Sequence, residues 1–322
     1  MSNSLVRRWL SLASCLLAAW SVPGQAAEVA YPLAVSIYED IYADYRQFVR
    51  GRDLASIDYY GGSGARRDVI EVVLLQQALQ LGGFKESLEL RDEQNYLRTL
   101  RQIADGELIS SGALVWYSDV LNLPDLFHIT QPVIDEGEFV VGLYTSPENQ
   151  KALAAKTLED LRQLRAVSSI QWYADVATLK NLDIHHLYFT TDWIHMVRMV
   201  SAGRADFTLA PFQPSAGMKI VLDDMELIPI EGIKVAINGT RHWPVSRRHP
   251  RGQEYYEALQ KGITLMKERG IIQQAYEESG FFHPEVDDWR LLNPPSKSAP
   301  QEEPATPIPS SAEGPAVTPP TN

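Results

Sequence analysis

Short β-type runs alternate with longer amphipathic helical runs through most of the chain, and this alternation restricts the fold more than any other feature. The first block reads as a strand at residues 31–38, a helix at 67–81, a strand at 87–90, a helix at 94–104 and a strand at 108–116. Strands that are separated by helices need crossover connections and therefore pair in parallel. The block predicts an α/β architecture built on a parallel sheet.

The pattern repeats in a second block. It consists of helices at 157–164, 173–180 and 193–201 and strands at 165–170, 186–189 and 206–210. Two further β-type segments, 138–144 and 232–237, bracket this block, and helices at 252–265 and 271–278 follow it. If both bracketing segments run between two lobes, the chain leaves lobe one, builds lobe two and returns. We therefore expect residues 28–142 and 234–292 to form lobe one, residues 143–233 to form lobe two, and the two crossover strands to act as a hinge.

The two ends of the chain differ in composition from the rest. Arg7 and Arg8 precede an apolar run at residues 9–22 and small residues at 24, 26 and 27, which is typical of a secretory signal peptide, and we expect residues 1–26 to be removed. Leu12 to Cys15 also resembles a lipobox, so a lipid anchor at Cys15 stays open as an alternative. Residues 293–322 hold nine of the twenty prolines and no aromatic residue, which predicts a disordered tail.

Charge and cysteine content narrow the function. The formal charge of -12 becomes -14 without Arg7 and Arg8, so nucleic acid and anionic membrane surfaces are poor partners. The only cysteine lies in the predicted signal, which leaves no disulfide, thiol nucleophile or cysteine metal ligand in the mature protein. We expect an exported, periplasmic monomer without a cofactor.

Several stretches resemble the extracellular solute-binding proteins of amino-acid ABC importers, the solute-binding protein family 3 type. They are residues 105–109 (DGELI), 129–133 (ITQPV), 157–161 (TLEDL), 201–206 (SAGRAD) and the ending at 262–280. The resemblance implies a two-lobed periplasmic binding protein type II fold. It also implies a small-molecule ligand held between the lobes and an inner-membrane permease or sensor as partner.

The same comparison shows where this chain departs from that family. Members that bind amino acids carry an arginine that clamps the ligand carboxylate, and residues 118–121 (SDVL) have none. The acidic residue that holds the ligand ammonium would fall near Pro211 and Phe212, which are uncharged, and Gln171 and Trp172 replace a small polar pair. We therefore expect a ligand other than a standard α-amino acid.

Candidate ligand-binding residues come from loops that follow strands or open helices, where this architecture places its ligands. They are Ser63, Arg66, Arg67, Ser111, Trp116, Ser118, Trp172, Thr190, Thr191 and Trp193. We expect Trp116 and Arg66 or Arg67 to line the groove that faces lobe two. A solvated arginine loop, an N-cap at Thr191 or Asp192, and tryptophans buried in packing are the structural alternatives.

An enzyme on the same scaffold is the alternative function. His128 with Asp119 or Ser118 could suggest a catalytic triad, but no nucleophile-elbow pattern accompanies them. His185 and His186 are adjacent in a predicted strand and point to opposite faces, so they do not easily share a metal ion with His195. These patterns favour a binding protein over an enzyme.

Overall fold

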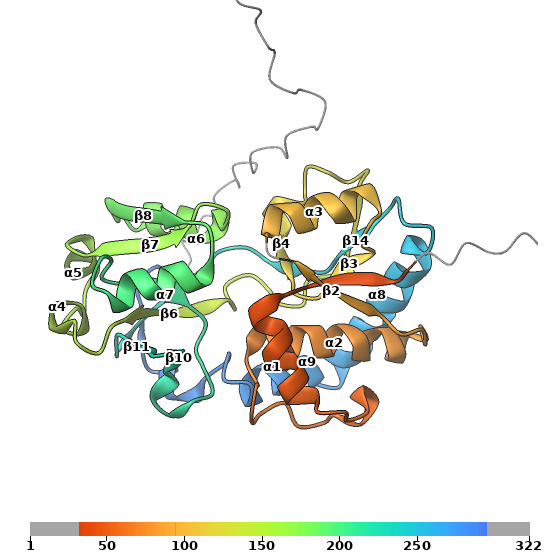
Figure 1. Ribbon diagram of the computed structural model, residues 1–322, viewed down its shortest axis with the longest axis horizontal. Helices are drawn as coiled ribbons and strands as arrows, with labels where there is room; N and C mark the ends of the chain where they lie inside the picture. The colour runs from red at the N-terminus through yellow and green to blue at the C-terminus, as the bar shows by residue number, and fades with distance from the viewer. Residues whose placement is uncertain (1–31, 94, 295–322) are drawn as a thin grey trace, which may run out of the picture. The chain divides into compact units, whose positions relative to one another are not determined.

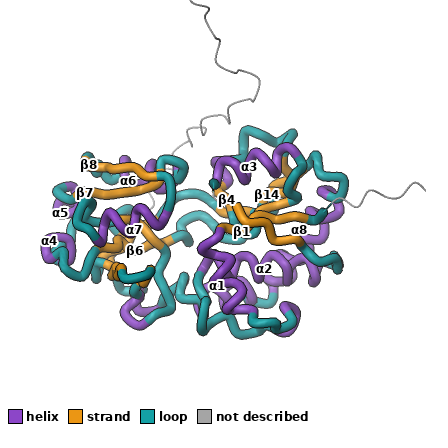
Figure 2. The backbone as a smooth tube through the Cα atoms, viewed as in Figure 1, coloured by secondary structure: helices purple, strands orange, loops and turns teal. Residues whose placement is uncertain are grey.

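The computed structural model describes residues 32–93 and 95–294, so the predicted signal peptide with Cys15 and nearly all of the predicted tail lie outside the described residues. The α-helices of this part are α1 (Glu39–Val49), α2 (Arg67–Gly82), α3 (Tyr96–Asp105), α4 (Gln150–Leu153), α5 (Leu158–Arg162), α6 (Tyr173–Asn181), α7 (Trp193–Ser201), α8 (Gly252–Glu268) and α9 (Ile271–Glu278). Short 3-10 turns are η1 (Leu54–Ser56), η2 (Tyr117–Asp119), η3 (Ala216–Met218) and η4 (Pro284–Val286). Figure 1 labels most of these helices, and Figure 2 separates helix, strand and loop by colour.

The first sheet contains the predicted parallel unit. Its strand order is β2 (Glu89–Glu93), β1 (Ala34–Tyr38), β3 (Ser110–Ser111), β14 (Pro244–Ser246) and β5 (Phe127–Ile129). Strand β1 pairs in parallel with β2 and β3, whereas β14 runs antiparallel to β3 and β5. Figures 1 and 2 show α3 on one side of this sheet and α2 on the other. The β-α-β-α-β prediction for residues 31–116 is therefore confirmed in its pairing.

Helix α2 is buried along most of its length and packs closely against α8. The backbones approach at two reciprocal points, where Gly82 lies against Ala258 and Gly262 lies against Ala78. A Cβ atom at Gly82 or Gly262 would fall 1.8 Å from the facing carbonyl oxygen, so only glycine fits at either position. This contact fixes the start of α2, which carries Arg67, relative to the C-terminal helices.

The second sheet has the order β10 (Ile220–Leu222), β11 (Met225–Pro229), β6 (Val140–Thr145), β12 (Ile233–Ala236) and β15 (Arg290–Leu291), and β9 (Thr208–Ala210) also pairs with β6. Strands β7 (Arg165–Ser169) and β8 (His186–Thr190) form a parallel pair, and a bridge from Ala166 to Phe207 connects them to the segment before β9. The segments expected as crossover strands, β6 and β12, pair with each other in antiparallel register within this sheet. The lobe boundaries and the hinge stay a prediction.

Two expectations for residues 31–116 need correction. Helix α1 was not predicted, although its buried residues Ile41, Tyr45 and Phe48 recur at helical spacing and pack onto the core beside α2. The run at 108–116 is not one strand. It divides into β3 and β4 (Val115–Trp116), because Gly112 approaches the carbonyl oxygen of Ser36 too closely for a side chain and the chain bends there. Strand β4 then pairs with β13 (Arg241–His242) instead of the first sheet.

Candidate functional site

The buried guanidinium of Arg241 is the centre of the candidate site. Arg241 lies on β13 and is 8% exposed, and its Nη2 donates a hydrogen bond to the carbonyl oxygen of Leu114. Its guanidinium carbon lies 4.8 Å from the ring centre of Trp116 and 4.9 Å from that of Phe139. Within the described ranges no carboxylate lies within ion-pair distance of it, which is unusual for a buried arginine. Burial lowers the pKa of Arg241 accordingly.

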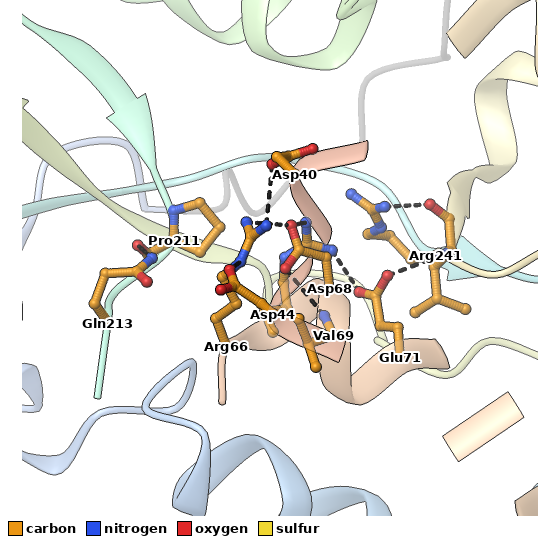
Figure 3. Close-up of polar contacts among 11 residues, drawn as sticks. Asp40, Asp44, Arg66, Asp68, Val69, Glu71, Pro211, Gln213 and Arg241 are labelled. Atoms are coloured by element: carbon orange, nitrogen blue, oxygen red, sulfur yellow. Dashed lines mark hydrogen bonds and ion pairs between the residues drawn. The ribbon is translucent and has the colours of Figure 1, made fainter. Parts of the chain in front are cut away.

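A second guanidinium, that of Arg67, lies on the same aromatic ring. Arg67 is the first residue of α2 and stands 5.3 Å from the centre of Phe139. Its Nη1 donates to Oε1 of Glu71 at 2.5 Å, one helical turn further along. The other oxygen of Glu71 accepts a hydrogen bond from the backbone N–H of Leu114 at 2.8 Å. Glu71 is fully buried, and its two oxygens hold Arg67 and the loop before β4 (the contacts of Glu71 are drawn in Figure 3).

Three buried donors in this cluster have no hydrogen-bond acceptor in the part of the chain that the structure describes. They are the Nε of Arg67, the Nε of Arg241 and the hydroxyl of Tyr276. Tyr276 lies on α9, and its ring packs on Phe281, which in turn packs on Phe139. Burial and the nearby Glu71 raise the pKa of Tyr276 well above its ordinary value, so the hydroxyl keeps its proton and remains a donor.

Two carboxyl groups flank the guanidiniums. Asp119 in η2 accepts a hydrogen bond from the Tyr96 hydroxyl through Oδ2, while its Oδ1 is buried without a partner among the described residues. Burial raises the pKa of Asp119 to about 6, although Tyr96 and Arg241 oppose the shift. Asp175 comes from α6, beside the β7–β8 pair, and burial raises its pKa to about 7 against the opposing charges of Arg241 and Arg67. Groups from both blocks of the chain therefore act on one another here.

Arg66 has a different environment from its neighbour Arg67. Its guanidinium makes contacts of 3.0, 2.8 and 3.0 Å to the carboxylates of Asp40, Asp44 and Asp68. These contacts, drawn in Figure 3, connect the start of α2 to α1. Three carboxylates already occupy this arginine, so its charge is compensated within the protein.

The predicted serines and Trp116 differ in burial and in their contacts. Ser63 is exposed and accepts a hydrogen bond from Gln47, whereas Ser111 is buried and donates to the carbonyl oxygen of Ala113 at 2.6 Å. Ser118 is half-buried in η2, next to Asp119. Trp116 is buried against Arg241 and Phe139, so its ring is part of the floor that carries the guanidinium.

The predicted residues of the second block lie together beside β8. Trp172 and Trp193 stack with ring centres 6.5 Å apart, and both pack against the core cluster around α7. Thr190 ends β8, and the Thr191 hydroxyl donates to Asp192 at 3.1 Å. Asp192 is the N-cap of α7, as the capping alternative allowed, because its Oδ1 accepts from the N–H of His195 at 2.9 Å.

The groups considered for catalysis or metal binding have other contacts. His128 stacks on Tyr256 at 4.9 Å, while Asp119 is bonded to Tyr96. In residues 32–93 and 95–294 no group of three His, Cys, Asp or Glu side chains could hold a metal ion. No helix of the described ranges is long and apolar enough to span a bilayer.

Of the residues in the cluster, only Arg67 and Trp116 were among the candidate ligand-binding residues. Arg241 and Glu71 were missed because each lies in a segment without a recognisable motif, and Tyr276 was missed because its stretch, 262–280, was interpreted only as part of the resemblance in fold. Glu71 had one available signal: it is a charged residue flanked by the apolar residues of a buried helix. Charged residues at such positions are almost never fully buried unless they are paired, so they point to a site.

Comparisons with known proteins bear on the fold. No family model matches the chain, and no curated protein matches it in sequence. The chain is 10% identical to the probable amino-acid ABC transporter extracellular-binding protein ytmK from Bacillus subtilis, with a TM-score of 0.50, over 65% of this chain and 86% of that one. It is 14% identical to the substrate-binding protein AbpA from Streptococcus pneumoniae bound to L-arginine (TM-score 0.49; 77% and 94% covered). It is 15% identical to the periplasmic VFT2 domain of BvgS from Bordetella pertussis (TM-score 0.49; 75% and 92% covered).

The likeness to ytmK shows the fold alone, because the identity is low. The chain has the α/β fold of type II periplasmic binding proteins, as the sequence predicted, with two main mixed sheets.

Proposed function

We propose that this chain is a receptor that binds a small solute at the Arg67–Arg241 cluster, between the lobe of residues 28–142 and 234–292 and the lobe of residues 143–233. One observation carries the proposal: Arg241 is buried without an ion-pair partner in the described part of the chain, at a place where Asp175 of the second lobe acts on it. An uncompensated buried charge is costly to the folded protein. A ligand whose charge pairs with Arg241 offsets that unfavourable free energy.

Closure of the two lobes is the working step of such a receptor. In this proposal β6 and β12 form the hinge, and their pairing in one sheet supports this, because a small twist of two adjacent strands rotates everything attached to them. The closed protein then delivers its solute to an inner-membrane permease or reports it to a sensor. Export to the periplasm follows from the signal expected at residues 1–26.

A receptor suits these residues better than an enzyme. The cluster offers guanidiniums, a tyrosine hydroxyl and carboxyl groups, which bind and orient a ligand. The residues that could suggest hydrolysis have other contacts, since His128 stacks on Tyr256 and Asp119 accepts a hydrogen bond from Tyr96. The genes beside this one distinguish the partners: permease and ATPase genes support import, and a kinase gene supports sensing.

The solute is proposed to be other than a standard α-amino acid, because residues 118–121 lack the family's arginine clamp. An α-amino acid bound here would instead have to place its carboxylate on Arg67 and Arg241 and its ammonium on Asp119 or Asp175. A melting-temperature screen with glutamate, arginine and histidine decides this point. Since ligand at about 100 times its dissociation constant adds about 2.7 kcal/mol of stability, a clear upward shift would contradict the expectation.

Native mass spectrometry of freshly purified mature protein tests the main proposal. We expect a small molecule to co-purify, and small-angle scattering to show a more compact protein with it than after its removal. A protein that carries no small molecule, and whose melting temperature no compound in a broad metabolite library changes, would refute the receptor function.

A further inference from the structure

We infer that the solute carries a carboxylate, and that Arg67 Nε–H, Arg241 Nε–H and the Tyr276 hydroxyl donate their hydrogen bonds to it. The inference rests on the proposed function and adds to it the chemical class of the ligand and the atoms that recognise it. None of the three residues lies at the position where the resembling family carries its arginine clamp, residues 118–121.

The donors come from three separate elements that converge on one aromatic ring. Arg67 begins α2, Arg241 lies on β13 and Tyr276 lies on α9. Both guanidiniums lie over Phe139, at 5.3 and 4.9 Å, and the Tyr276 ring reaches the same residue through Phe281. The two guanidiniums also act on the pKa of Tyr276, which both of them lower against the larger effect of burial.

All three donors are buried, and none has an acceptor in the described ranges. Tyr276 is fully buried, Arg241 is 8% exposed and the side chain of Arg67 is 13% exposed. Buried donors are almost always satisfied, so three unsatisfied ones in a single cluster require an explanation. An acceptor for all three needs several lone pairs and no competing proton, and a carboxylate meets this requirement.

The positive charges of Arg67 and Arg241 require an anion as well. Glu71 makes a contact ion pair with Arg67 and accepts the backbone N–H of Leu114 with its second oxygen, and it makes no contact ion pair with Arg241 in the described part of the chain. Arg67 also lies 3.8 Å from the carboxylate of Asp68, which it shares with Arg66. Among the described residues Arg241 is therefore the guanidinium of the pair that has no carboxylate in direct contact, and a ligand carboxylate supplies one. Guanidinium groups recognise planar carboxylates through paired N–H donors. An ammonium group is a point charge and has no such pair of donors in a fixed plane.

The neighbouring carboxyl groups fit the other end of such a ligand. Asp119 Oδ1 is a buried acceptor without a partner among the described residues, and Asp175 approaches from the second lobe. A hydroxyl group on the ligand would donate to them. The site therefore suits a small carboxylic acid that also bears a hydrogen-bond donor, which bridges the two lobes.

The experiment uses the mature protein, stripped of co-purified solute by unfolding and refolding. Its melting temperature is measured with acetate, L-lactate, succinate, benzoate and L-glutamate, and with the amide of each acid. We expect at least one carboxylate to raise the melting temperature and its amide to have no effect. A binder without a carboxylate group would overturn the inference and leave the receptor function intact, whereas no binder and no co-purified molecule would refute the receptor function itself.

Variants then test the three donors with the carboxylate that binds. Tyr276→Phe removes one hydroxyl that has no described partner, so the ligand-free protein should keep its melting temperature. The dissociation constant should rise about tenfold or more, as for the loss of a hydrogen bond to a charged group. Arg241→Lys keeps the charge and loses the Nε donor, and it should weaken binding by at least as much.

Tyr255→Phe is the matched control. Tyr255 is equally buried, but it lies on α8 against Phe84 and near Ser110, away from the guanidiniums. Its loss should leave carboxylate binding unchanged. Carboxylate binding that survives both Tyr276→Phe and Arg241→Lys without weakening would overturn the assignment of these donors.

Discussion

Replacing Asp206 by asparagine should unfold this protein more easily at neutral pH and make no difference in strong acid. Asp206 is the last residue of the SAGRAD stretch and connects three elements. Its carboxylate accepts both side-chain bonds of a fork from Arg165, each 2.9 Å long, and the Arg165 backbone N–H at 2.8 Å. It also accepts from Asn149, the N-cap of α4, at 3.0 Å. An amide in the same place can accept at one atom only.

The magnitude follows from the shift in the pKa of Asp206. Burial by itself raises this pKa, but the hydrogen bonds from Arg165 and Asn149 lower it from 3.8 to about 2. A carboxyl group with that difference between unfolded and folded protein contributes about 2.4 kcal/mol at neutral pH. The Arg165 side chain is 39% exposed and solvent screens it, so we expect about 1.5 kcal/mol. Because the folded pKa is the lower one, this stability is present above about pH 4 and is lost as the pH falls towards 2.

Urea denaturation from pH 2 to pH 7, followed by circular dichroism, measures the effect. The difference in unfolding free energy between the wild type and Asp206→Asn should be near zero at the acid end and reach its full value by about pH 5. Asp183→Asn is the control, since Asp183 pairs with Arg162 on the exposed surface and should contribute at most a few tenths of a kcal/mol. If the difference in unfolding free energy between the wild type and Asp206→Asn does not change with pH, the reasoning is refuted. The difference would then arise from altered packing and not from the charge of the carboxylate.

Two further predictions concern packing and the site. Gly262→Ala should destabilise the protein by about 1–3 kcal/mol or more in urea denaturation, because the new Cβ would lie 1.8 Å from the Ala78 carbonyl oxygen. Helix propensity alone would predict the opposite, a gain in stability of about 1 kcal/mol. Asp175→Asn should raise the melting temperature of the ligand-free protein above neutral pH. Burial raises the pKa of Asp175 from 3.8 to about 7, so the wild type loses stability between those pH values as this group ionises. We expect the two proteins to melt at the same temperature at pH 4 and the variant to melt at a higher temperature at pH 8. A difference in melting temperature that is the same at both pH values would contradict this prediction.

The secondary structure of this protein was largely determined by its sequence alone. Helix α2, predicted at 67–81, is observed at Arg67–Gly82, and α7, predicted at 193–201, is observed at Trp193–Ser201. Strands β7 and β8 also follow their predicted positions closely. Hydrophobic periodicity, capping residues and helix-ending glycines act over a few neighbouring residues, so a local pattern contains the information. Where such a pattern was overlooked, as in α1, it was nevertheless present in the sequence.

The composition of the candidate site was decided by tertiary structure. Arg66 and Arg67 are adjacent and chemically identical, yet Arg66 meets three carboxylates while Arg67 faces Phe139 and Glu71. Arg241 reaches the same ring from the far end of the chain, and Tyr276 packs on Phe281, which contacts that ring. Whether a charged side chain finds a partner depends on which elements pack around it, and no sequence period encodes contacts between segments so far apart. Local order is therefore readable from the chain, while the uncompensated charge at Arg241 arises only when the helices and strands pack together.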